Sequence, residues 1–376
     1  FSPNGENQSF SMKFEQSLTV QAEQRLRELL APLPLVLERS VVEQAGVDLT
    51  LDLCEAERRW TLVCEVKSNG QPRHIRGAAL QAREMAQRFS VSGPTYPVVV
   101  APFISEAAGT ICRELEVGYA DLAGNCRLAF GSVYIEKSVA GNPFHVKREQ
   151  RSLFAPKSAR VLRIMLGAPS REWKVAELAE RADVSYGQVS KVRQALIDRE
   201  WVAGRWGGVR LAQPHALLEA WKQAYAPLRK ARNRYYTLLH GEELQRSLRE
   251  IFLSPGREGA APAAPGEHVL LGSFSAARWL APYARVAGEF FYTDSEGEAR
   301  LKAMLKLEPA AKGENITIDL AADEGVFQEA IEPAPGLHCT GLIQTYLDLA
   351  AAGERGGEAA QHLFDERIAP LWKTDA

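Results

Sequence analysis

Apolar and polar residues alternate along the first 140 residues in a pattern that predicts an α/β domain over 13–140. Apolar residues recur at helical spacing from Leu18 to Leu30, so we expect a helix that stops before Pro32. Two alternating segments, 47–53 and 62–67, are joined by a polar turn at 55–59 and predict an antiparallel hairpin. Further helices are expected at 76–89 and 105–116, and strands at 96–101, 118–122, 126–130 and 132–137.

Residues 157–214 carry three helical patterns followed by a hairpin pattern, in the order of a winged helix-turn-helix. The helices are expected at 159–166, 175–181 and 186–199, and Ser185 is a natural N-cap for the third. A glycine-rich tip at 204–208 separates the two strands of the expected wing. The segment LAERADVSYGQVSKVRQALIDREWV resembles the winged-helix families of bacterial regulators along its whole length.

The third helix of this segment supplies the candidate DNA-contacting residues. Its apolar face leaves polar and basic side chains outside, of the kinds that reach base edges and phosphates in the major groove. The set is Ser185, Tyr186, Gln188, Ser190, Lys191, Arg193 and Gln194, with Arg205 and Arg210 on the wing. The segment 157–213 holds eleven Lys and Arg against six Asp and Glu in a chain of net charge −2. We therefore expect double-stranded DNA as the partner, bound by a homodimer, and a solvated or protein-binding face is the alternative.

The predicted hairpin of the first domain carries a second candidate site. Glu65 and Lys67 lie two residues apart on one strand face, and a turn near residue 57 places Asp48 opposite Glu65 and Val66. Two carboxylates can hold a divalent metal, and a lysine can orient or deprotonate a water molecule. Asp52 competes with Asp48 for the role of the site aspartate.

This Asp48…Glu65-x-Lys67 pattern resembles the PD-(D/E)XK nuclease superfamily, which implies a restriction-endonuclease-like fold. The resemblance makes Asp48, Glu65 and Lys67 the catalytic residues, and Glu28, Asp48 and Glu65 the metal ligands, with Gln81 as an assisting residue. Mg²⁺ would be the cofactor if the site is active, and DNA binding itself requires none. The alternative is an ion-paired strand face retained in a domain that now only binds.

The remaining chain reads as a helical extension, 215–253, and a mixed α+β domain, 267–376. Polar, proline-containing segments at 141–156 and 254–266 are expected as linkers. The run Tyr225–Tyr236 is interpreted as a helix whose Arg229, Lys230, Arg232 and Arg234 extend the phosphate contact.

Two segments of this last part, 269–283 and 342–372, resemble the AbiEi family of antitoxin-type transcriptional regulators from type IV toxin-antitoxin systems. The residues that carry the resemblance are Gly272-Ser273…Ala276-Ala277, Gln344-x-Tyr346-Leu347-Asp348-Leu349 and Gly356-Gly357-Glu358-Ala359-Ala360. The resemblance implies a winged helix that represses its own operon and a remaining part linked to antitoxin activity, with a toxin protein as a further partner. A nuclease-like N-terminal domain is not part of the short antitoxin pattern.

Composition excludes several other classes of protein. No run of about 18 apolar residues is present, and the first residues lack the order of a secretory signal, so we expect a cytoplasmic protein without a membrane partner. Five scattered cysteines without a Cys-x-x-Cys pair argue against a disulfide framework or a zinc site. Three hypotheses remain: a DNA-binding regulator, a metal-dependent DNase guided by the winged helix, and an antitoxin whose main partner is a protein.

Overall fold

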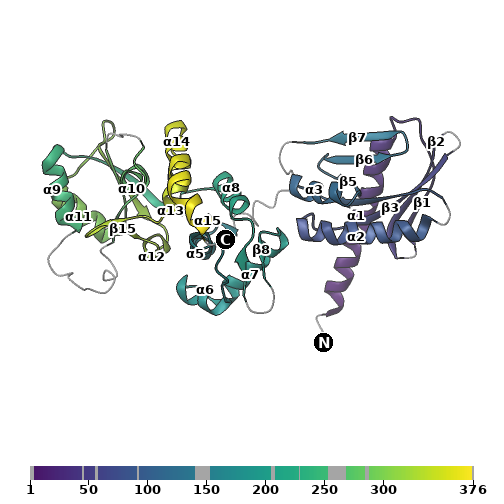
Figure 1. Cartoon of the computed structure of the whole chain (residues 1–376), viewed down its shortest axis with the longest axis horizontal. Coiled ribbons are helices and arrows are strands. Elements are labelled where there is room, and N and C mark those ends of the chain that lie inside the picture. Colours follow the sequence, from purple (N-terminus) through teal and green to yellow (C-terminus); the bar gives the residue numbers. More distant parts are fainter. Residues whose placement is uncertain are drawn as a thin grey trace. The chain divides into compact units, whose positions relative to one another are not determined.

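The computed structural model describes residues 4–44, 46–55, 58–90, 93–139, 153–204, 208–227, 229–252, 268–283 and 288–374. The chain forms two compact units (Figure 1). The first consists of Phe1–Val146 with Ile197–Glu200, and the second of Lys147–Leu196 with Trp201–Ala376. Among the helices of the described ranges, none is long and apolar enough to cross a membrane.

The first unit is built on a seven-stranded sheet whose strands lie side by side in chain order. The central strands β3, β4 and β5 are parallel, and the remaining neighbours are antiparallel. The strands are β1 (Val36–Gln44), β2 (Val47–Glu55), β3 (Arg58–Val66), β4 (Thr95–Ala101), β5 (Gly118–Asp121), β6 (Cys126–Phe130) and β7 (Val133–Lys137). The predicted hairpin is confirmed as β2 and β3, with Leu49 opposite Cys64.

Helices cover both faces of this sheet (Figure 1). The helix α1 (Asn4–Leu30) packs on the face that carries Leu49, Cys64 and Val98. The helices α2 (Pro72–Phe89) and α3 (Glu106–Glu114) pack on the other face, where Val99 is buried. Because successive strand residues point to opposite faces, the neighbours Cys64 and Glu65 project toward different helices.

The second unit begins with three helices and a short hairpin. They are α5 (Pro156–Gly167), α6 (Val175–Arg181), α7 (Tyr186–Asp198), β8 (Val202–Ala203) and β9 (Arg210–Leu211). The predicted helix 175–181 has the expected bounds, and the third helix ends one residue earlier than expected. β8 and β9 are antiparallel, and Trp173 adds a bridge to Val209.

A second seven-stranded sheet follows, in the order β13-β10-β14-β12-β11-β16-β15. Its strands are β10 (Arg229–Tyr236), β11 (Val269–Leu271), β12 (Glu289–Thr293), β13 (Glu308–Pro309), β14 (Ile316–Ala321), β15 (Ile331–Ala334) and β16 (Leu337–Cys339). The helices are α8 (Pro214–Ala224), α9 (Gly241–Phe252), α10 (Ser273–Leu280), α11 (Ser295–Leu305), α12 (Gly325–Gln328), α13 (Leu342–Ala350), α14 (Glu354–Leu363) and α15 (Ala369–Thr374). A π-helical turn, Phe364–Ile368, joins the last two.

The predicted helix over Tyr225–Tyr236 is wrong, because Arg229–Tyr236 forms the strand β10. Its exposed and less exposed residues alternate, which is the period of a strand and not of a helix. Asp319 on β14 holds Arg232 in a two-pronged ion pair and lies 3.5 Å from Arg229. These arginines therefore pair with acids of their own sheet instead of extending a phosphate-binding face. The residues 215–253 are consequently not a helical extension, because β10 belongs to the C-terminal sheet.

One hydrophobic core joins α5–α7 to this second sheet and its helices. The indole Nε1 of Trp372 on α15 donates a hydrogen bond of 2.9 Å to the carbonyl of Leu166 on α5. The rings of Phe154 and Trp221 stack 5.6 Å apart within the same core. The predicted boundaries at 214 and 267 therefore do not divide the packing of the second unit.

Candidate nucleic-acid interface and carboxylate-lysine cluster

The start of α7 is fixed by the side chain of Ser185 and by the turn that precedes the helix. Asp183 adopts a left-handed backbone conformation with φ of 49°, which turns the chain sharply between α6 and α7. The hydroxyl of Ser185 accepts a hydrogen bond of 3.2 Å from the backbone N–H of Gln188. This contact caps the first turn of α7, as the sequence predicts.

The outer face of α7 is polar and exposed. Val189, Val192 and Leu196 are buried in the core, whereas the opposite side of the helix faces solvent. Tyr186, at the N-terminal end, is 64% exposed. The exposed predicted residues are Ser185, Tyr186, Ser190, Lys191 and Gln194.

Two predicted contact residues, Gln188 and Arg193, are half-buried instead. The side-chain amide of Gln188 donates a hydrogen bond of 2.8 Å to the hydroxyl of Ser158 on α5, so it ties the two helices together. On the hairpin, Arg210 is exposed on β9, and Arg205 lies outside the described residues.

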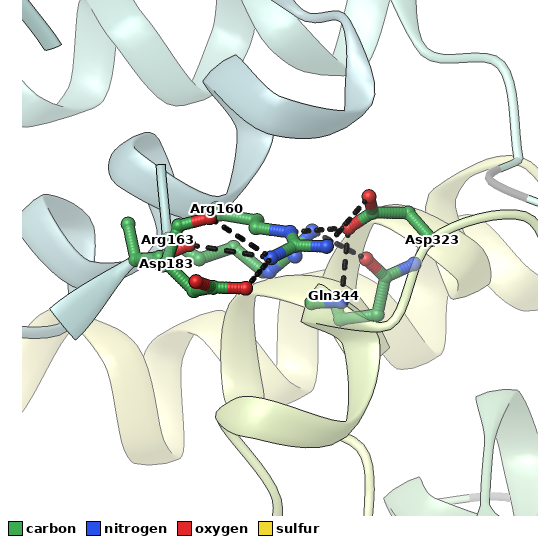
Figure 2. A network of polar contacts seen from close by, with 7 residues as sticks. Arg160, Arg163, Asp183, Asp323 and Gln344 are labelled. Atoms are coloured by element: carbon green, nitrogen blue, oxygen red, sulfur yellow. Dashed lines mark hydrogen bonds and ion pairs between the residues drawn. The ribbon is translucent and has the colours of Figure 1, made fainter. Parts of the chain in front are cut away.

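Part of the local positive charge is buried in a network of polar contacts (Figure 2). Arg160 on α5 forms ion pairs with Asp323, at 2.7 Å, and with Asp183, at 3.2 Å. It also donates to the backbone carbonyl of Asp183, at 3.3 Å, and thereby holds the turn before α7. Arg163 is 2% exposed. The local excess of basic residues therefore overstates the charge available to DNA, because neither arginine faces solvent.

A polar network inside the second unit continues from Arg163. Its Nη1 donates to Gln344 Oε1 at 3.3 Å, and Gln344 in turn donates to Asp348 at 3.1 Å. Asp348 also accepts hydrogen bonds from the hydroxyls of Tyr225 and Tyr292. Burial raises the pKa of Asp348 to about 6, although these three donors oppose the shift.

Gln344 and Asp348 lie one turn apart on α13, which places both side chains on the same face of the helix. Nearby glycines allow the close packing of this region. A Cβ on Gly272 would lie 2.8 Å from the ring of Tyr292, and one on Gly356 would lie 2.2 Å from the carbonyl oxygen of Leu349. These are the residues of the motifs quoted from the sequence.

Residues 210–369 match a family model: transcriptional regulator, AbiEi antitoxin, type IV toxin-antitoxin (TA) system. The AbiEi match begins at β9 and contains the polar network on α13 together with the whole second sheet. It leaves α5, α6, α7 and the first unit outside. Comparisons of the chain with curated proteins and with solved structures find no match.

The candidate carboxylate-lysine cluster lies in the first unit, outside the AbiEi match. Lys67 Nζ lies 2.9 Å from Glu65 Oε2 and 4.0 Å from Asp48 Oδ2. Asp48 Oδ2 also accepts a hydrogen bond of 2.7 Å from the backbone N–H of Val66. The β2–β3 register thus brings together the three residues that the sequence singles out.

Glu65 is the buried member of this cluster. Its side chain is fully buried, whereas those of Asp48 and Lys67 are 37% and 33% exposed. Burial raises the pKa of Glu65, and its hydrogen bond to Lys67 lowers it in part. Its second oxygen, Oε1, has no hydrogen-bond partner among the described residues. An unsatisfied buried carboxylate oxygen is costly, and a cation or water could satisfy it.

The other predicted members of the site lie apart from this cluster. Glu28 is on α1, which covers the sheet face opposite to Glu65, and it pairs with Arg25 at 3.6 Å. Asp52 accepts a hydrogen bond of 2.7 Å from the hydroxyl of Thr61, so Asp48 is the aspartate beside Lys67. Gln81 is exposed on α2. Within the described ranges no group of three or more His, Cys, Asp or Glu side chains could hold a metal ion.

Proposed function

We propose that the chain is a DNA-binding transcriptional regulator of a type IV toxin-antitoxin operon, and that α7 is its DNA-reading helix. The observation that carries the proposal is the AbiEi match over residues 210–369, which begins at the second strand of a hairpin that follows three helices in winged-helix order. The matched part suggests the regulatory role, and the preceding helices supply a surface suited to DNA.

The outer face of α7 supports this assignment by its chemistry. A helix in the major groove needs hydrogen-bonding side chains along one face and positive charge close to the phosphates. Ser190, Lys191 and Gln194 provide such a face on α7. Arg210 on β9 is placed on the hairpin, where a wing contacts the backbone or the minor groove.

A gel-shift titration with the DNA upstream of the chain's own operon tests the proposal. We expect the intact protein to retard this duplex and the Lys191→Ala variant to bind it about tenfold more weakly, because a phosphate or base contact is lost. Affinity should fall steeply between 50 and 200 mM salt, with a slope that becomes shallower by about one in Lys191→Ala.

Lys312 offers a matched control, since it is an exposed lysine between β13 and β14. The Lys312→Ala variant should bind DNA as the wild type does. Unchanged affinity in Lys191→Ala, or a flat salt profile for the wild type, would contradict the assignment of α7. A protected region with inverted repeats in footprinting would support a dimer on DNA.

A second function, metal-dependent DNA cleavage, is favoured by the Asp48, Glu65 and Lys67 cluster. Two carboxylates, one with an unsatisfied buried oxygen, fit a hard divalent cation such as Mg²⁺, which completes its shell with water and phosphate oxygens. A bound Mg²⁺ would supply Lewis-acid stabilisation of the scissile phosphate. Asp48 and Glu65 would hold the ion, and Lys67 would orient the attacking water.

Plasmid cleavage with Mg²⁺ or Mn²⁺ tests this second function. Wild-type protein should nick the DNA, and Lys67→Ala should lose cleavage while retaining the gel shift, because the cluster and residues 185–194 of the DNA-reading face belong to different units. Lys137→Ala, an exposed lysine on β7, serves as the control and should cut normally. An absence of metal-dependent cleavage on duplex, branched and single-stranded DNA would contradict the nuclease function and leave the regulator proposal intact.

A further inference from the structure

A cavity of about 180 Å³ lies in the second unit, between α5 and the helices α13 and α15. Most of its wall is apolar and includes Leu166, Ile331, Ile343 and Trp372. Pockets for drug-sized ligands have volumes of about 300–1,000 Å³, so this cavity is of the size for a small metabolite.

Arg163 supplies the positive charge in the cavity wall. It is 2% exposed, and its one hydrogen bond within the described residues is the contact of Nη1 with Gln344 at 3.3 Å. The N–H groups of Nε and Nη2 have no partner there. A buried guanidinium with two unsatisfied donors is destabilising, because it has lost its water without gaining an acceptor.

Glu329 supplies a negative charge in the same wall. Its carboxylate makes no hydrogen bond or ion pair with any described residue, and burial raises its pKa. Arg163 and Glu329 influence each other electrostatically, yet they form no ion pair within 4 Å. The cavity therefore presents two opposite charges that do not neutralise each other directly, together with an apolar wall.

We propose that this cavity binds a small zwitterion, an α-amino acid with an apolar side chain. The Nε and Nη2 groups of Arg163 have no partner among the described residues and are enclosed by protein, so the guanidinium would turn toward the cavity on binding and donate to the ligand carboxylate in a forked arrangement. The carboxylate of Glu329 would accept hydrogen bonds from the ammonium group. The apolar wall, which includes Ile331, Ile343 and Trp372, would surround the ligand side chain. Such a ligand pairs with the buried Arg163 and the half-buried Glu329 at once and also covers the apolar wall, which water alone would leave hydrated.

The position of the cavity connects it to the turn before α7. Arg163 lies one turn after Arg160 on α5, and Arg160 holds the backbone and side chain of Asp183. A ligand that shifts Arg163 would move α5 and, through Arg160, the start of α7. We therefore infer that the amino acid changes the affinity of the protein for DNA, an inference that rests on the proposed function.

Titration calorimetry on the full chain tests the binding site first. The probes are L-leucine, L-isoleucine, L-methionine and L-phenylalanine, with two leucine analogues: 4-methylpentanoic acid, which lacks the amino group, and 3-methylbutylamine, which lacks the carboxyl group. We expect at least one amino acid to bind, and the two leucine analogues to bind at least tenfold more weakly than that amino acid. Binding of none of the four amino acids, or equal binding of either analogue, would overturn the proposal.

Three variants and a control assign the binding to this cavity. Arg163→Met and Glu329→Gln should each weaken binding at least tenfold, because each removes one of the two charges. Leu371→Trp narrows the cavity from a side chain that is 45% exposed, so it should weaken binding even if Arg163→Met fails to fold. Arg355→Met, an exposed arginine on α14, should bind normally. Amino-acid binding as tight as in the wild type by both Leu371→Trp and Glu329→Gln would overturn the assignment of the binding site to this cavity.

A gel shift with and without the amino acid then tests the coupling. A change of at least threefold in DNA affinity, absent in Leu371→Trp, supports it. If the amino acid binds and DNA affinity is unchanged, the coupling is overturned and the site remains. If the chain does not bind DNA at all, the proposed function fails, whereas calorimetry still decides the cavity proposal independently.

Discussion

Arg160 and Asp323 form a two-pronged ion pair, with Nε to Oδ1 at 2.7 Å and Nη2 to Oδ2 at 2.9 Å. The side chains are 8% and 11% exposed, so water competes little for either charge. Because Arg160 also holds Asp183, the pair connects the segment between β14 and α12 to the turn before α7 (Figure 2).

The Asp323→Ala variant should be strongly destabilised. Removing Asp323 leaves the buried charge of Arg160 with only Asp183, whose side chain is 78% exposed, as its acidic partner, which costs about 2–4 kcal/mol in the free energy of unfolding. Urea denaturation followed by tryptophan fluorescence measures this loss, because six of the seven tryptophans lie after residue 146. Glu84→Ala breaks an exposed ion pair with Arg88 and should cost less than about 0.5 kcal/mol. A comparable decrease of the free energy of unfolding in both variants would contradict the explanation that a buried ion pair contributes more than an exposed one.

Substitutions of Gln188 and Lys191 should have different effects, the first on the stability of the fold and the second on DNA binding. Gln188→Ala removes a part-buried hydrogen bond to Ser158 and should lower the free energy of unfolding by about 0.5–1.5 kcal/mol. Lys191→Ala should leave the thermal melt unchanged and weaken DNA binding. Paired melting and gel-shift measurements check both outcomes. A lower melting temperature in Lys191→Ala would show that the Lys191 side chain stabilises the fold.

Asp348 should make the stability of the second unit depend on pH between about 4 and 6. Its pKa is about 6 in the folded protein, against an ordinary value of 3.8. In this window the folded state holds the proton and the unfolded state releases it, so rising pH favours unfolding. The free energy of unfolding falls by up to roughly 3 kcal/mol, and this decrease is complete above pH 7.

The Asp348→Asn variant lacks this titration and provides the comparison. Its stability relative to the wild type should improve as pH rises from 4 to 7 and stay constant above that. Denaturation midpoints at several pH values measure the difference. A constant difference over the whole range would mean that Asp348 does not titrate there.

Lys67→Met should destabilise the first unit more at high pH than at low pH. The pKa of Glu65 is raised by burial and lowered by Lys67, so loss of Lys67 raises it further. Below the ordinary pKa of glutamate, Glu65 is protonated in both states and the substitution costs little. At pH 8 the uncompensated carboxylate should cost about 1–3 kcal/mol. The double variant Lys67→Met/Glu65→Gln should lose this pH dependence, and an unaltered dependence would contradict the explanation.

Local patterns predicted the elements with strong periodicity, but not those defined by distant partners. Alternation over β2 and β3 was sufficient to predict the hairpin and to place Asp48 beside Glu65. The strand β1 was not expected, because none of its described side chains is buried and its apolar pattern is weak. An edge strand forms through backbone pairing, which leaves little trace in the side chains.

Charge was the feature that the sequence predicted least well. Arg160 and Arg163 contribute to a basic segment that resembles a DNA-binding surface, yet both are buried. Their acidic or polar partners, Asp323 and Gln344, lie more than 160 residues away in the chain. No local pattern identifies such partners. The exposed side of α7 could be predicted from spacing, whereas the role of Gln188 depended on a contact with Ser158 that spacing does not reveal.

The strand β10 has a consequence for any attempt to divide the protein. The proline- and glycine-rich stretch 254–266 follows β10 and α9 in sequence, but β10 lies between β13 and β14, which come after that stretch. A gene split at this stretch would give two polypeptides, neither of which holds a complete second sheet. When produced together, we expect them to reconstitute a non-covalent heterodimer, whereas each produced alone would expose an unpaired strand edge and aggregate.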